Sequence, residues 1–275
     1  MKKDKNSITS IAIGGFDGMH LAHQTLFSNL SENGALIVIE TGYANITPKN
    51  EREAYTNFPL FYYELNNIKH LEGKEFIELL KKEFPNLKKI VVGFDFCFGK
   101  NRTYCVNELK AMFDGKVKII NEISIDNIAV HSRVIREYIK NGNFKTVQTL
   151  LGRKYKIKGT QVRGQGLGKT EFVPTINLEV KDFILPNEGV FITKTVVDKI
   201  PYPSITFIGH RVTTDGSFAV ETHILQGDIK VHDEHITIKF YDKLRENQKF
   251  ESFEKLKNQI VDDIKNCKKF FNLEL

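Results

Sequence analysis

One segment, GGFDGMHLAHQ at residues 14–24, constrains the fold of this chain more than any other. It follows the apolar run at residues 11–13 and precedes a helix-like segment at residues 24–30. A strand, a glycine turn and a helix in this order leave backbone N–H groups free to face a phosphate. His20 and His23 are three residues apart, so a helix start places both imidazoles on one face, where they can donate to one triphosphate. The residues alone also fit a simple strand-to-helix turn with two surface histidines.

Length, composition and charge narrow the class of protein. The 275 residues have room for one large or two ordinary domains, and 41% hydrophobic with 27% charged residues fits a soluble globular protein. The net charge is +6, but the basic residues are scattered, so we expect anionic substrates and no nucleic-acid partner. The charged start of the chain precedes no apolar segment, so it is not a signal peptide, and no apolar run approaches the roughly 20 residues that span a bilayer. No membrane partner is therefore expected.

The cysteines predict a reducing compartment. Cys97, Cys105 and Cys267 form no C-x-x-C pair and no plausible disulfide framework. A cytoplasmic location follows from that prediction. Cysteine and histidine are not grouped as zinc ligands either.

The two halves of the chain differ in their hydrophobic patterning. In the first half, short apolar runs alternate with helical patterns, which predicts a parallel sheet with helical crossovers. The expected strands are residues 10–13, 35–39, 89–92 and 116–120, and the expected helices are residues 24–30, 74–84 and 108–113. Two further helices, capped by Ser132 and Asn143, lead to six strand-like runs at residues 155–162, 175–180, 190–197, 204–208, 218–224 and 235–241. The sequence therefore predicts an α/β domain at residues 1–151 and, at residues 152–275, a six-stranded antiparallel barrel with a C-terminal helix.

The second half carries a glycine-rich loop and two oxygen-bearing side chains. Alternate glycines let backbone N–H groups approach an anion, and a lysine adds a point charge. This loop contains Gly164, Gly166, Gly168 and Lys169. Thr175 and Asn177 alternate with an isoleucine, so on an extended chain both oxygens face one side, where a hydroxyl and an amide carbonyl suit Mg²⁺. A glycine-rich hairpin followed by an ordinary strand would show the same residues.

Five blocks of the second half resemble the riboflavin kinase domain. The loop and strand just described resemble G-x-G-x-G-[RK]…P-T-x-N. The other blocks are residues 185–191 (L-P-x-x-G-V-Y), 209–213 (G-x-R-P-T), 220–225 (V-E-x-H-[IL]-L) and 240–250 (F-x-x-x-[LI]-R-x-x-x-x-F). The resemblance implies that Glu221 is the general base for the riboflavin 5′-hydroxyl, that Thr175 and Asn177 hold Mg²⁺, and that the glycine loop binds ATP phosphates. It also implies that Arg245 contacts flavin. Without the resemblance, Glu221 would read as an exposed carboxylate on an alternating strand.

Three blocks of the first half resemble the adenylyltransferase half of bacterial bifunctional riboflavin kinase/FAD synthetases. Residues 14–23 resemble the nucleotidyltransferase signature G-x-F-D-G-x-H-x-G-H, residues 91–102 resemble V-x-G-x-D-F-x-F-G-x-x-R, and residues 131–136 resemble S-S-T-x-I-R. The resemblance implies a Rossmann-like nucleotidyltransferase domain in which His20 and His23 stabilise charge on the reacting phosphates. It implies flavin contact by Asp95. The residues implied for ATP phosphates are Gly14, Phe16, Asp17, Gly18, Ser132 and Arg136.

The first half departs from the family pattern at several positions. Ala22 stands where the family usually has Gly, Gly15 where it often has Asn, and Cys97 where it often has Arg. Residues 39–48 replace the family's T-F-x-P-H-P block, which is expected near the flavin or the nucleotide.

Together these patterns predict an enzyme with two activities. The barrel half phosphorylates riboflavin with ATP and Mg²⁺ to give FMN, and the α/β half transfers AMP from ATP to FMN to give FAD and pyrophosphate. Flavins are substrates and products, so no tightly bound organic cofactor is expected. One alternative is a riboflavin kinase whose first half has lost adenylyl transfer, which residues 39–48 favour. Another is a flavin-sensing or nucleic-acid-binding regulator, for which the isoelectric point near 9.0 is the only support.

Overall fold

The computed structural model describes residues 4–162, 173–213, 215–226, 229, 231 and 234–274. Contacts divide the chain into two compact units, Met1–Val134 and Ile135–Leu275. Helix α5 (Ser132–Lys140) begins in the first unit, and α6 (Phe144–Leu151) belongs to the second. The boundary after residue 151 stays a prediction for the two functional domains. Among the described residues, no helix is both long and apolar enough to cross a membrane.

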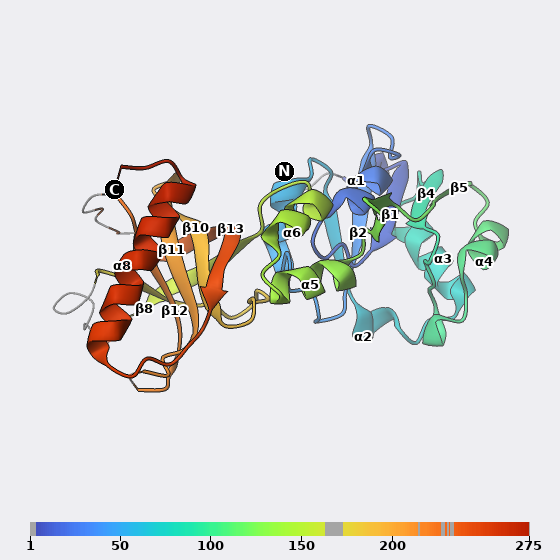
Figure 1. The fold of residues 1–275 in the computed structure, drawn as a ribbon. Helices are drawn as coiled ribbons and strands as arrows, with labels where there is room; N and C mark the ends of the chain where they lie inside the picture. The colour runs from blue at the N-terminus through green and yellow to red at the C-terminus, as the bar shows by residue number, and fades with distance from the viewer. Residues whose placement is uncertain are drawn as a thin grey trace. The chain divides into compact units, whose positions relative to one another are not determined.

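The first unit is built on a five-stranded parallel sheet in the order β3-β2-β1-β4-β5 (Figure 1). Its strands are β1 (Ser10–Gly14), β2 (Gly34–Glu40), β3 (Leu60–Glu64), β4 (Lys89–Gly93) and β5 (Lys116–Ile120). Its α-helices before α5 are α1 (Leu21–Phe27), α2 (Leu65–Ile68), α3 (Gly73–Glu83) and α4 (Val106–Met112). The short elements are the 3₁₀ turns η1 (Lys5–Ser7), η2 (Lys49–Tyr55) and η3 (Lys100–Arg102) and the hairpin β6 (Ser124–Ile125) with β7 (Ile128–Ala129). The parallel α/β fold expected from the sequence is confirmed.

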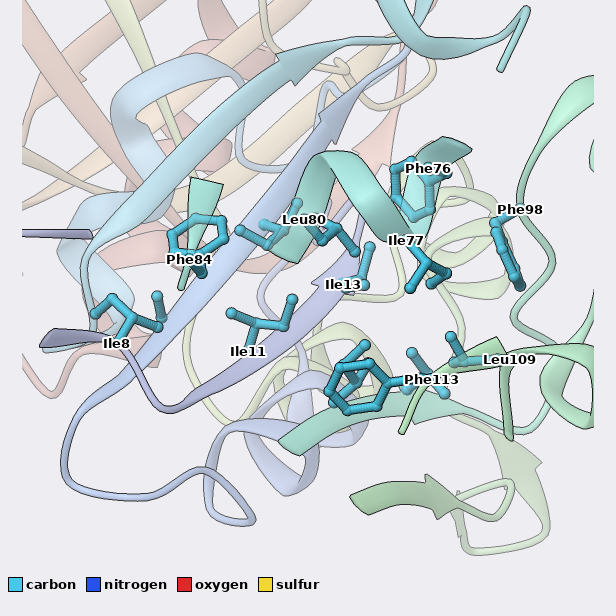
Figure 2. Close-up of a cluster of buried hydrophobic side chains, with 14 residues drawn as sticks. Ile8, Ile11, Ile13, Phe76, Ile77, Leu80, Phe84, Phe98, Leu109 and Phe113 are labelled. Atoms are coloured by element: carbon cyan, nitrogen blue, oxygen red, sulfur yellow. The ribbon is translucent and has the colours of Figure 1, made fainter. Parts of the chain in front are cut away.

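Alternation along β1 sends side chains into two cores. Ile11 and Ile13 pack on one face with Phe76 and Leu80 of α3, as Figure 2 shows. Ala12 faces the opposite core, which also holds the α1 residues Leu26 and Phe27. Both faces of the sheet are thus covered, which explains why the strands read as continuous apolar runs.

Helix α1 and strand β3 differ from the expectation, and α2 and the β6–β7 hairpin were not predicted either. Helix α1 begins at Leu21 rather than residue 24, because His20 caps it: its Nδ1 accepts the N–H of His23 at 3.4 Å. Strand β3 was not predicted; it follows Pro59 and pairs in parallel with β2. Its Leu-Phe-Tyr-Tyr sequence has high strand propensity but no alternation, because its first four side chains are all half-buried.

The second unit contains a closed antiparallel barrel in the order β10-β11-β12-β9-β8-β13. Its strands are β8 (Lys156–Val162), β9 (Ile176–Glu179), β10 (Gly189–Val197), β11 (Ile200–His210), β12 (Phe218–Ile224) and β13 (His235–Glu246). Helix α8 (Phe253–Phe270) lies along the outside of the barrel (Figure 1). The predicted six-stranded barrel and closing helix are confirmed. Strand β11 begins earlier than predicted, since Pro201 and Pro203 still take extended conformations there.

A ring of five buried hydroxyl groups ties three barrel strands together. Thr193 bonds to Ser204 at 2.8 Å and to Thr206 at 2.7 Å, and Thr195 bonds to Ser204 at 2.9 Å and to Thr222 at 2.8 Å. Thr206 donates to Thr222 at 2.9 Å and closes the ring. All five residues are fully buried, so the ring satisfies hydroxyls that would otherwise destabilise the barrel interior. It also fixes the register of β12, the strand that carries Glu221.

The expectation that the cysteines form no disulfide was wrong. Cys97 and Cys105 are joined across a short reverse turn, while Cys267 is free and buried. The turn pairs Phe98 with Tyr104 through backbone bonds of 2.7 and 3.2 Å, which brings the two flanking cysteines opposite each other. Sequence spacing alone could not reveal this pairing, because the turn had not been recognised between them.

Candidate active sites

The first unit has a pocket of about 680 Å³. It lies where β1, β2 and β4 end, at the carboxyl edge of the sheet, the usual ligand position in open α/β folds. Of the residues predicted for this site, the pocket is lined by Gly14, Phe16, His20, His23, Asp95 and Ser132. It also contains residues that the sequence interpretation did not single out, namely Thr41, Lys69, Asn121 and Arg133.

His20, His23 and Ser132 form one cluster at the start of α1. The two imidazoles stack with centroids 3.6 Å apart, and the Ser132 hydroxyl lies 3.3 Å from His20 Nε2. Ser132 donates to the Asp17 carbonyl at 2.7 Å. Because His20 Nδ1 accepts the His23 N–H, a neutral His20 carries its proton on Nε2, facing Ser132. The structure therefore brings the first and third motifs of this half together.

Asp17 and Gly18 form hydrogen bonds to residues 45–47, which lie in the segment 39–48 that departs from the family pattern. The Asp17 carboxylate accepts the N–H groups of Asn45 at 3.2 Å and of Ile46 and Thr47 at 2.9 Å each. Gly18 has a φ of +87° and donates its N–H to Thr47 Oγ1 at 2.6 Å. Neither residue lines the pocket. Their contact with ATP phosphates remains a prediction, while the contacts present give both a role in shaping the loop.

The remaining predicted residues of this half have different surroundings. Gly14 lines the pocket, and a Cβ there would meet the Phe16 ring at 3.0 Å. The Phe16 side chain is 2% exposed and packs edge-on to Phe27 and His23, so its ring is part of the core. Arg136 lies one helical turn after Ser132 on α5 and is assigned to the second unit.

The second unit has a pocket of about 210 Å³ between the barrel and α8. Thr175, Asn177, Glu221 and Arg245 all line it, as do apolar residues of α8 such as Leu256 and Ile260. Glu221 on β12 and Asn177 on β9 are direct antiparallel partners, which explains how residues 44 positions apart share the site. The predicted loop residues Gly164, Gly166, Gly168 and Lys169 lie outside the described residues.

Arg211 is a residue of this site that the sequence did not reveal. Its Nη2 donates to Glu221 Oε1 at 2.5 Å and to Asn177 Oδ1 at 3.0 Å, and its Nε lies 3.1 Å from the same Glu221 oxygen. The side chains of Arg211 and Glu221 are only 17% and 23% exposed. The G-x-R-P-T resemblance contained this arginine, but no pattern within the sequence linked it to the carboxylate.

Hydrogen bonds to Glu188 fix the loop on which Arg211 sits. The Glu188 carboxylate accepts hydrogen bonds from the backbone N–H of His210 at 2.9 Å and from the Asn247 side-chain amide at 2.8 Å. The His210 ring nitrogen Nδ1 lies 2.7 Å from the same carboxylate. These bonds, led by the His210 backbone N–H, lower the pKa of Glu188 from 4.5 to about 2. Gly209, with a φ of +148°, lets the loop pass close to Glu188; a Cβ would lie 2.7 Å from its Oε2.

Arg245 connects the barrel to α8. Its guanidinium forms an ion pair with Asp263, with distances of 2.8 to 3.1 Å, and Asp263 is 3% exposed. The Arg245 guanidinium also lies 5.7 Å from the Phe250 ring centroid. Flavin contact by Arg245 stays a prediction, since these bonds already give the side chain a structural role.

The oxygen donors of the barrel pocket fit Mg²⁺ rather than a transition metal. Among the described residues, no group of three or more His, Cys, Asp or Glu side chains can hold a metal ion. The Thr175 hydroxyl, the Asn177 amide oxygen and the Glu221 carboxylate are hard ligands for a weakly held cation, whose coordination shell phosphate oxygens and water would complete. The donor set therefore suits a cation that arrives with a nucleotide.

His223 lines the same pocket, on β12. Its Nδ1 lies 2.7 Å from the Pro174 carbonyl oxygen, next to Thr175, and burial lowers its pKa below 6.5. A neutral His223 imidazole donates its Nδ1 proton to this carbonyl and so fixes the backbone next to Thr175.

Comparison with known proteins identifies similarity in both halves. A riboflavin kinase family model matches residues 151–271, and an FAD synthetase family model matches residues 60–134. A bifunctional riboflavin kinase/FMN adenylyltransferase from Buchnera aphidicola (Acyrthosiphon pisum) is 31% identical over 98% of this chain and 96% of its own. One from Escherichia coli K12 is 26% identical over 96% and 93%. A crystal structure described as a macrolide-efflux protein from Streptococcus pneumoniae has a TM-score of 0.85 at 26% identity and covers 98% and 97% of the two chains.

Proposed function

This chain belongs to the bifunctional riboflavin kinase/FMN adenylyltransferase family, and from that premise we propose which of its residues carry the two reactions. Riboflavin is phosphorylated to FMN in the barrel unit. FMN is then adenylated to FAD at the pocket of the parallel sheet. ATP is the co-substrate of both steps.

In the barrel, Glu221 takes the proton of the riboflavin 5′-hydroxyl as this oxygen bonds to the γ-phosphorus of ATP and the bond from that phosphorus to ADP breaks. Such general-base catalysis contributes roughly 10²–10⁴-fold. Thr175 and Asn177 would hold Mg²⁺, which would supply charge stabilisation at the transferring phosphoryl group. Apolar side chains of α8, including Leu256 and Ile260, line the same pocket as Glu221 and suit the flavin ring system. The observation that carries this proposal is the pairing of Asn177 with Glu221 at one pocket.

At the parallel sheet, the FMN phosphate attacks the α-phosphorus of ATP and pyrophosphate leaves, so no protein nucleophile is needed. His20 and His23 stabilise the charge on the reacting phosphates. The His20 Nε2–Ser132 Oγ contact of 3.3 Å is longer than an ordinary N–H···O bond. The Nε2–H group can therefore donate a hydrogen bond to a phosphate oxygen instead. Asp95 at the pocket contacts the flavin.

A time course of flavin products tests the assignment. Purified protein is incubated with riboflavin, ATP and Mg²⁺, and the flavins are separated by chromatography. FMN should form first and FAD later, and omission of Mg²⁺ should stop the first step. FMN without FAD would favour the monofunctional kinase with the altered segment at residues 39–48. Neither product from folded protein would contradict both assignments.

We also propose a cytoplasmic protein with no nucleic-acid partner. ATP and phosphorylated flavins are its substrates, which supports a location where nucleotides are made and used. The Cys97–Cys105 disulfide means that the cysteines no longer support a reducing compartment. Cell fractionation tests the location, and a salt-dependent shift of DNA or RNA would contradict the absence of nucleic-acid binding.

A further inference from the structure

We propose that Arg211 is a cation placeholder in the kinase pocket. Its guanidinium lies against the Asn177 and Glu221 oxygens, and it exchanges them for an ATP phosphate when the metal-bound nucleotide enters. The inference rests on the proposed function, because that function assigns Asn177 to Mg²⁺ and Glu221 to the riboflavin hydroxyl.

The contacts of the guanidinium define the placeholder arrangement. One nitrogen, Nη2, bonds to both Glu221 Oε1 at 2.5 Å and Asn177 Oδ1 at 3.0 Å. Nη1 donates to Ser217 Oγ at 2.7 Å, and Ser217 in turn donates to the Asp215 carboxylate at 2.9 Å. A positive charge therefore already occupies the place between the amide oxygen and the carboxylate.

The backbone under Arg211 is fixed, so the exchange needs only a side-chain movement. The Arg211 N–H donates to the Ser217 carbonyl at 2.9 Å, and the Gly216 N–H donates to the Arg211 carbonyl at 3.1 Å. The preceding residue, His210, is held by Glu188. The Cα of Arg211 can stay in place while its long side chain turns from the two oxygens to a phosphate.

Electrostatic repulsion prevents the Arg211 guanidinium and a metal ion from occupying the Asn177 oxygen at the same time. A divalent cation bound to Asn177 Oδ1 would lie about 4–5 Å from a guanidinium that donates to the same oxygen, where repulsion weakens binding by at least about tenfold even at the dielectric constant of water. Once displaced, the guanidinium keeps its planar fork of donors, which matches phosphate oxygens. The entering nucleotide therefore separates Arg211 from Asn177 and Glu221 in one step. Its cation binds the Asn177 oxygen, and its phosphate binds the guanidinium.

Metal binding without nucleotide tests the placeholder directly. Mn²⁺ is titrated into full-length protein as a probe for Mg²⁺, and binding is followed by the relaxation rate of water protons. We expect Arg211→Met to bind Mn²⁺ about tenfold more tightly than the unaltered protein, and Arg211→Lys, which keeps the charge, to stay close to it. Lys181→Met is the matched control, because Lys181 pairs with Glu179 on the same strand as Asn177 but is 72% exposed; its affinity should not change.

Equal or weaker Mn²⁺ binding by folded Arg211→Met, including no binding by either protein, would overturn the placeholder. A second readout is the rate of FMN formation at saturating Mg²⁺, which should fall roughly 10²-fold in Arg211→Met because the phosphate contact is lost. Tighter metal binding with slower transfer is the expected combination. If the unaltered protein makes FMN but the Mn²⁺ affinities are equal, the placeholder is wrong and the kinase assignment stands. If it makes no FMN, the proposed function itself fails.

Discussion

His20 and Ser132, separated by 112 positions in the chain, lie 3.3 Å apart through Nε2 and Oγ. The contact joins the glycine turn after β1 to the start of α5, so two sequence motifs of the first unit form one cluster. It also orients His20, whose other ring nitrogen accepts the N–H of His23.

Replacement of His20 by alanine should remove FAD formation from FMN and leave FMN formation from riboflavin unchanged. The imidazole is assigned to the phosphates of the adenylyl step and lies in the first unit, whereas the kinase residues lie in the second. The two rates are measured separately, each with its own flavin substrate. Ser132→Ala is the milder companion variant, since it removes a contact to the imidazole and keeps the ring. Loss of both activities in folded His20→Ala would mean that the sites are not separate.

Asp17→Asn should destabilise the first unit by about 1–3 kcal/mol, because an amide cannot accept all three backbone N–H groups that now end on the carboxylate. Thermal or denaturant unfolding gives the difference in free energy. Asp114→Asn is a suitable control: Asp114 pairs with Lys81 at 2.9 Å with its side chain 78% exposed, and its loss should change little. A change no larger than in this control would contradict the proposed anchoring of residues 45–47.

The stability of the barrel should depend on Glu188 in acid. Its pKa is about 2 in the folded protein against 4.5 normally, so the unfolded chain binds the proton more readily. Its stabilising contribution is complete above about pH 4.5 and is lost as the pH falls toward about 2. The melting temperatures of the unaltered protein and Glu188→Gln should differ most above this window and converge within it. A constant difference down to about pH 2.5 would argue against the charge as the cause.

Thiol titration should distinguish the three cysteines. Protein kept from reductants should show no reactive thiol when folded and one when unfolded, because Cys97 and Cys105 are bonded and Cys267 is buried. Burial also raises the pKa of the Cys267 thiol to about 12, which keeps it out of the reactive thiolate form. Unfolding after reduction should expose all three. Two reactive thiols in folded, unreduced protein would show that the disulfide is absent.

The architecture could be predicted from the sequence because its signals are local. Apolar runs such as residues 35–39 and the uninterrupted strands after residue 152 determine the sheet and the barrel by their periodicity. The contacts that define the sites are not local: Arg211 meets Asn177 only after barrel closure, and Asp17 meets residues 45–47 only after β1 and β2 pair. The disulfide likewise depends on a turn, between Cys97 and Cys105, that periodicity does not encode.

Mixing two variants tests the central claim that separate sites perform consecutive reactions. Glu221→Gln should leave riboflavin unphosphorylated yet still convert added FMN to FAD, and His20→Ala should stop at FMN. Supplied with riboflavin, ATP and Mg²⁺, neither variant alone should make FAD, but the mixture should, because FMN from one protein becomes the substrate of the other. A mixture of folded variants that makes no FAD, with each variant inactive in both steps, would contradict the account.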